Sequence, residues 1–129
     1  MPKNSELYNA LVALLELAAA TKPQQGPEGT RKPVIDPLPA HVGFRLALCR
    51  NALRPTGEAI DEQRERLRAE CFEGGNSDPT RFESELRRIL DEETDWTPPA
   101  KIKLSQLGDR QIPDAWLSAW AAVGILVDE

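Results

Sequence analysis

Residues 40–73 read AHVGFRLALCRNALRPTGEAIDEQRERLRAECFE, and the rest of the chain has to fold around this stretch. Its apolar positions are spaced by four, three, four, seven and seven residues: Val42, Leu46, Cys49, Leu53, Ile60 and Leu67. A stripe that repeats about every 3.5 residues predicts a helix that packs lengthwise along other helices. A continuous helix here would be about 50 Å long, so its apolar seam needs cover from the remaining segments.

Pro55 and Gly57 interrupt this predicted helix. A proline inside a helix costs about 3 kcal/mol and a glycine about 1 kcal/mol. Because Leu53 and Ile60 are seven residues apart, the seam keeps its register across the interruption. We therefore expect either one kinked helix or two nearly collinear helices. The run Gly74-Gly75-Asn76 then predicts the end of the long helix and a turn.

Two shorter helices are expected, one before and one after the long helix. Asn4 or Ser5 can cap an N-terminal helix that runs to about Ala20. Asp78 followed by Pro79 has the chemistry of an N-cap and a first helical residue, which predicts a helix over residues 79–93. Three acids occupy the C-terminal end of that helix, where they oppose the macrodipole and favour fraying.

The connecting segments have a different character. Residues 21–37 are rich in proline and glycine and predict a flexible loop. Residues 102–104 alternate apolar and basic side chains and predict one short strand, with residues 95–97 as its expected partner. A last helix is expected from Pro113 to about Gly124.

The expected fold class is therefore mainly α. We predict a helical bundle or hairpin around one long, proline-kinked helix, with a short extended segment near the C-terminus. A chain of 129 residues with 40% hydrophobic residues is expected to form a single domain spanning residues 1–129.

The charge balance argues against nucleic acid as the main partner. The formal net charge is −5, and residues 61–129 carry nine basic against sixteen acidic side chains. An acidic surface repels phosphate backbones and acidic membranes. The apolar run Leu11 to Ala20 contains Glu16, lacks a basic leader and is too short to span a bilayer. We therefore expect a cytoplasmic protein that makes no membrane contact.

The residues that usually carry catalysis are sparse. His41 is the only histidine, so neither a pair of histidine ligands nor a Ser-His-Asp triad can form. Cys49 and Cys71 lie far apart along the predicted long helix, and we expect two reduced structural thiols. The carboxylates occur in charged runs typical of a hydrated helix face. We therefore expect no enzyme activity, no cofactor and no metal site.

Two groups of side chains are candidates for partner binding. Trp116 and Trp120 are four residues apart and share one face of the last helix, where they either pack against the long helix or form an interface hot spot. Arg45, Arg50 and Arg54 form a basic set near the edge of the seam. They either lie on a solvated face or pair with acids, from a partner or from Asp91–Glu93.

Five stretches taken in order resemble a group of small proteins of tailed phages and prophages. They are LYNALVALLEL (7–17), LPAHVGFRLALCRNAL (38–53), EAIDEQRERLRAE (58–70), FESELRRILDEE (82–93) and PPAKIKLSQLGDRQIP (98–113). The resemblance covers nearly the whole chain except residues 21–36. It implies a phage setting, in the host cytoplasm or on the virion, and it supplies no catalytic residues.

From this resemblance we expect a protein-interaction module that serves as a phage accessory or virion-assembly component. The alternative is a phage-encoded inhibitor that binds and disables a host protein. The partner would then be a phage structural protein or a host protein. The seam is also longer than either short helix can easily cover, so a homodimer packed through the long helix stays open beside a monomer.

Overall fold

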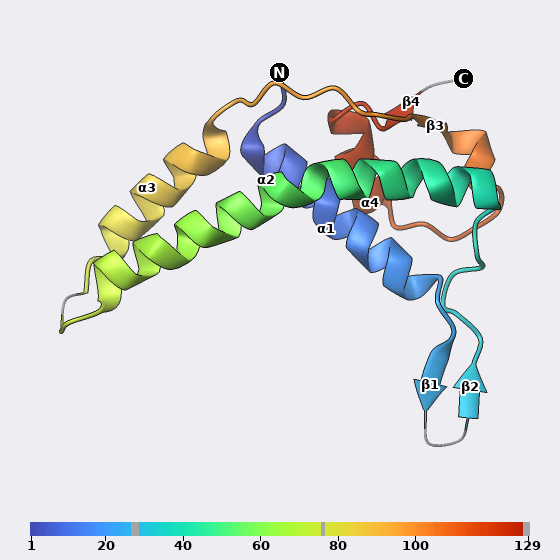
Figure 1. The fold of residues 1–129 in the computed structure, drawn as a ribbon, viewed down its shortest axis with the longest axis horizontal. Coiled ribbons are helices and arrows are strands. Elements are labelled where there is room, and N and C mark those ends of the chain that lie inside the picture. Colours follow the sequence, from blue (N-terminus) through green and yellow to red (C-terminus); the bar gives the residue numbers. More distant parts are fainter. Residues whose placement is uncertain (27–28, 76, 128–129) are drawn as a thin grey trace.

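One helix of 33 residues, α2 (Ala40–Phe72), runs across most of the molecule in the computed structural model (Figure 1). The structure describes residues 1–26, 29–75 and 77–127. Helices make up 63% of the chain and a small two-stranded sheet lies near the C-terminus, which confirms the predicted fold class. The helix continues through Pro55, and its axis bends near its middle in Figure 1. Of the two expectations, the single kinked helix is the one observed.

Pro55 is tolerated because it lies on the solvent side of α2. A proline has no N–H to donate, so the carbonyl of Asn51 loses its helical partner. Both residues are exposed, and water can therefore satisfy that carbonyl. A bend that is convex toward solvent is the usual consequence of such an arrangement.

The core forms where α1 (Asn4–Ala20) packs against the first half of α2. Each helix contributes one apolar face, and the members of these faces are at most 6% exposed: Leu7, Leu11, Leu14 and Leu17 from α1, and Val42, Leu46, Cys49 and Leu53 from α2. The first half of the predicted seam is therefore buried as expected.

The start of α1 differs from the prediction. Lys3, not Asn4 or Ser5, is the N-cap residue. The backbone N–H of Lys3 donates a hydrogen bond to the Glu6 carboxylate at 2.9 Å. Asn4 has a tertiary role instead. Its side-chain amide donates to the carbonyl of Ile89 at 2.9 Å, and its side-chain oxygen accepts from the Thr94 hydroxyl. The side chain thus ties α1 to the last turn of the helix α3 (Pro79–Asp91) and to Thr94 just after it.

The second half of α2 pairs with α3 (Pro79–Asp91), which runs back along it to form a projecting helical hairpin (Figure 1). We call residues 58–72 of α2 together with α3 the arm. Ile60 and Leu67 are 3% and 9% exposed, so the second half of the seam is also covered. Gly74 and Gly75 have φ angles of 70° and 79°, which suit glycine and permit the predicted turn. Asn76, the third residue of that run, lies outside the described residues.

The helix α3 begins at a side-chain cap, and the residues that follow its end pair with the N-terminal segment. The Asp78 carboxylate accepts from the backbone N–H of Arg81 at 3.1 Å, which confirms the predicted cap. The helix ends at Asp91, and Glu92 accepts a backbone hydrogen bond from Asn4 at 2.9 Å. The N–H of Thr94 donates to the carbonyl of Pro2 at 3.0 Å. The expected fraying of residues 91–93 is therefore replaced by pairing with the N-terminal segment.

The C-terminal strand pairing also differs from the prediction. Strand β3 (Ile102–Lys103) pairs in parallel with β4 (Leu126–Val127), not with residues 95–97. Between them lie a short 3-10 helix, η1 (Leu104–Leu107), and α4 (Asp114–Ala122), which packs mainly against α1. The two strands bring the C-terminal segment back against the core.

The predicted loop 21–37 contains regular structure. Strands β1 (Gln24–Gly26) and β2 (Gly29–Arg31) form a small antiparallel hairpin that projects below α1 in Figure 1. Ile35 is 6% exposed, and its N–H donates to the carbonyl of Ala20 at 3.0 Å. The segment therefore supplies one core residue that its composition did not predict. Residues 27 and 28 of the predicted loop lie outside the described residues.

Candidate functional site

The face of α2 that points away from the core carries an apolar stripe. Its members recur at intervals of four, four and three residues, and we call Phe44, Leu48, Ala52 and Pro55 the outer stripe. Phe44 is 64% exposed and Leu48 is 37% exposed, and the other two are also exposed. Side chains with this spacing lie on one side of a helix. The stripe therefore presents an aromatic and an aliphatic side chain on a rigid element.

A stripe on this face was not predicted, because the sequence argument followed only the seam that became the core. The signal was nevertheless present. Phe44 and Leu48 are four residues apart, and successive helical residues are about 100° apart. Phe44 therefore lies on nearly the opposite side of α2 from Val42 and Leu46.

The three predicted arginines do not form one basic surface. At about 100° per residue, Arg50 and Arg54 lie close in angle, whereas Arg45 lies about 140° from Arg50. Arg45 donates through Nη1 to the carbonyl of Lys101 at 3.1 Å and so holds the segment that leads into β3. Arg50 is half-buried on the side that faces α1, and Arg54 is exposed. In the described part of the chain, none of the three forms an ion pair with the acids at 91–93.

The two tryptophans do share a face, and their ring centroids are 6.4 Å apart. Trp120 is 0% exposed, and Trp116 is half-buried beside Ala13 and Glu16 of α1. Core packing is thus the alternative that holds for Trp120. Its main neighbour is α1, however, and not the long helix as expected. Trp116 is the member of the pair that a partner could reach.

The structure places the two cysteines and the single histidine of the sequence. Cys49 and Cys71 are free and buried, which confirms the two reduced thiols. The Cys49 thiol donates to the carbonyl of Ala100 at 3.2 Å, and burial raises its pKa while this hydrogen bond lowers it to a smaller extent. His41 is exposed. Among residues 1–26, 29–75 and 77–127, no group of three His, Cys, Asp or Glu side chains is placed to hold a metal ion.

Within the described residues, no helix combines the length and the apolar character needed to cross a bilayer. Comparisons of the chain with protein-family models, with curated proteins and with solved structures find no match. What the protein does is therefore inferred from the exposed surfaces of the molecule.

Proposed function

We propose that the protein is a non-enzymatic interaction module that docks onto a protein partner through the outer stripe. The observation that supports this is the exposure of Phe44, at 64%, beside Leu48 on the same helix face. Exposed aromatic side chains on rigid elements are typical anchors of protein interfaces. An apolar stripe that leaves such side chains exposed on a folded chain is typical of an interaction surface.

The spacing of the stripe suggests the kind of contact. Apolar side chains at intervals of three and four residues fit a hydrophobic groove, as amphipathic helices do when they bind a partner. In the phage setting that the resemblance implies, the partner would be a structural protein of the virion. The chain would then act as an accessory or virion-assembly component.

The test uses a phage that encodes the chain with both stripe residues changed, Phe44→Glu and Leu48→Glu. Both side chains are exposed, so the variant should keep the helical circular-dichroism spectrum of the wild type. Val34→Glu is the matched control, because Val34 is 81% exposed and lies outside α2. We expect mass spectrometry of purified particles to find the wild type and the control in them, and the double variant to be lost.

Three results would redirect or contradict the proposal. Absence of the wild-type chain from purified particles would contradict a role in the virion. Recovery of one host protein with the wild type and the control, but not with the double variant, would favour the alternative of an inhibitor. Equal partner recovery with all three chains would remove the outer stripe as the docking surface.

A further inference from the structure

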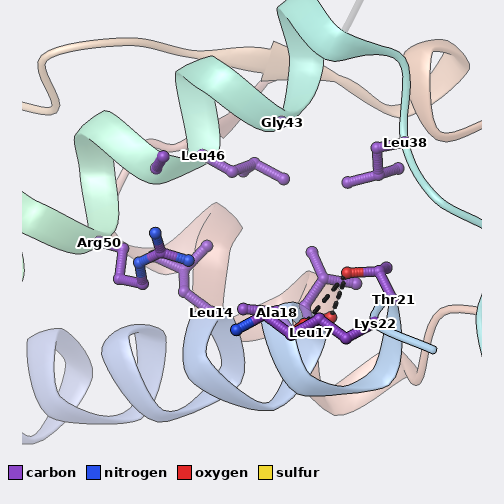
Figure 2. A pocket seen from close by; sticks show the side chains of 10 residues that line it. Leu14, Leu17, Ala18, Thr21, Lys22, Leu38, Gly43, Leu46 and Arg50 are labelled. Atoms are coloured by element: carbon purple, nitrogen blue, oxygen red, sulfur yellow. Dashed lines mark hydrogen bonds between the residues drawn. The ribbon is translucent and has the colours of Figure 1, made fainter. Parts of the chain in front are cut away.

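A pocket of about 210 Å³ lies between the C-terminal half of α1 and the first half of α2 (Figure 2). We call it the α1–α2 pocket. Most of its wall is apolar and comes from Leu14, Leu17, Ala18, Leu38, Leu46 and Ala47. Arg50 lies at one end of the wall, and Thr21 and Lys22 lie at the end of α1. Its volume exceeds that of an apolar cavity of about 150 Å³ that binds benzene.

Gly43 leaves one side of this pocket unfilled. A Cβ added at Gly43 would meet no atom within 4 Å outside its own helix turn. Leu46 from α2 and Leu38 from the segment before it both line this space in Figure 2. The space is therefore available to a bound group.

Arg50 supplies a polar group to this apolar wall. Its Nε atom is buried and has no hydrogen-bond partner among the described residues. A buried donor without a partner is costly, so such a group gains when a ligand satisfies it. The Thr21 hydroxyl, by contrast, donates to the carbonyls of Leu17 and Ala18 at 3.0 and 3.2 Å (Figure 2). The Thr21 hydroxyl is thus already satisfied, whereas the Arg50 guanidinium offers a ligand a donor without a partner.

A second recess adjoins the pocket and shares Ala18, Lys22 and Arg50 with it. Arg54 also lines this recess, which therefore has the two guanidinium groups of Arg50 and Arg54 in its wall. Within the described part of the chain, no residue that lines either space carries a carboxylate. Because the chain has a net charge of −5, this local positive charge is not a property of the whole surface.

We propose that the α1–α2 pocket binds an aliphatic anion, a hydrocarbon chain of medium length that ends in a carboxylate or a phosphate. The chain would occupy the leucine-lined pocket, and the headgroup would accept hydrogen bonds from Arg50 beside Arg54. A guanidinium binds either headgroup through two parallel N–H donors. This site lies on a different face of α2 from the outer stripe and does not depend on the proposed docking there.

Isothermal titration of the full chain tests the proposal with four probes: octanoate, octyl phosphate, octanol and butanoate. We expect at least one of the two eight-carbon anions to bind with a stoichiometry of one. Octanol should bind at least about tenfold more weakly, because it cannot make the charge-assisted hydrogen bonds. Butanoate should also bind at least about tenfold more weakly, because it buries fewer methylene groups. The tighter of the two anions identifies the headgroup.

Two variants locate the site. Arg50→Met should weaken binding of the preferred anion about tenfold, whereas the matched control Arg45→Met, outside the pocket, should leave it unchanged. Gly43→Leu grows into the open space and should abolish binding. Because leucine is a better helix former than glycine, this variant should also fold. Its melting temperature verifies that.

Three results would overturn the proposal. The first is that neither anion binds the wild type at about 1 mM, the weak end of specific affinity. The second is that octanol binds as tightly as octanoate and octyl phosphate, which would mean that Arg50 recognises no headgroup. The third is that Gly43→Leu, while folded, binds the anion as the wild type does.

Discussion

Two glycines of α2, Gly43 and Gly57, differ in the space available for a side chain. A Cβ at Gly57 would collide with the terminal Cδ2 methyl of Leu11, so any larger residue where α1 crosses α2 requires that side chain to shift. A Cβ at Gly43 would meet nothing within 4 Å. Gly57 therefore does not act as the helix breaker that its sequence position suggested. It permits the close approach of two helices.

The two glycines give opposite predictions for the same substitution. Gly43→Ala should raise the free energy of unfolding by about 0.5–1 kcal/mol, because alanine is the better helix former. Gly57→Ala should lower it by about 1 kcal/mol, because overpacking against Leu11 outweighs that gain. Urea denaturation of both variants measures the difference. A stabilised Gly57→Ala would mean that Leu11 can move aside at little cost.

Cys49 predicts a pH dependence of stability. Burial holds its pKa above the ordinary 9.0 in the folded state. The unfolded chain then loses the thiol proton at lower pH than the folded chain does. The stabilisation is complete below the unfolded pKa and is lost as the pH rises through the folded pKa.

We therefore expect the wild type to lose stability between about pH 8 and about pH 10 faster than Cys49→Ala does. The alanine variant is less stable throughout, because it leaves a cavity, but it lacks this titration. Other groups that titrate in this range are common to both chains and cancel in the difference. Parallel curves for the two chains would show that the thiol does not contribute.

At the scale of elements, the arm covers the second half of the seam within one chain. Both seam positions in this half, Ile60 and Leu67, are buried, and α3 packs against this half of α2. The two helices are also joined by an ion pair between Glu70 and Arg81 at 3.1 Å. The side chains of Ile60 and Leu67 are therefore not free to form a dimer interface. The homodimer stays a prediction, and it would need another surface of the molecule.

The same observation predicts what a charge in the seam would do. Ile60→Lys or Leu67→Lys would bury an ammonium group between α2 and α3, which is strongly unfavourable. We expect partial loss of the helical circular-dichroism signal and a lower melting temperature. Ala59→Lys, which adds the same side chain at an exposed position, is the control and should change neither. Full helicity in Ile60→Lys and Leu67→Lys would mean that α3 does not pack on this face.

At the scale of the whole molecule, burial is uneven. Six residues of α1 are buried, whereas no residue of α3 is fully buried. In the arm, α2 contributes the buried Ile60 and Leu67, whereas α3 contributes half-buried side chains such as Phe82, whose ring centroid lies 5.5 Å from that of the exposed Phe72. The body is held by the fully buried faces of α1 and α2.

Hydrogen exchange should follow this division. Opening a segment that buries little apolar area costs less free energy than global unfolding. We expect the amides of α3 to exchange before those of α1 and of the first half of α2. Mass-spectrometric exchange at neutral pH measures this order. Equal protection of α1 and α3 would mean that the arm and the body unfold as one unit.

The local features of this fold were readable from the chain. The seam in residues 40–73, the cap at Asp78, the glycine turn and the reduced thiols all depend on neighbours within a few turns. Periodicity marks the side of a helix that must be covered, and local chemistry marks where a helix starts and stops. The mainly α class followed from these signals.

What covers each face was settled only by tertiary structure. The pairing of β3 with β4, the burial of Ile35, the packing of Trp120 on α1 and the close approach at Gly57 all join segments distant in the chain. The candidate surfaces depend on such contacts too, because Arg45 donates to the carbonyl of Lys101, which lies 56 residues away in the chain. Each of these contacts forms because, among several apolar segments that could meet, one pair buries apolar surface without a steric clash. A residue pattern records the need for a partner, but it does not record which partner meets that need.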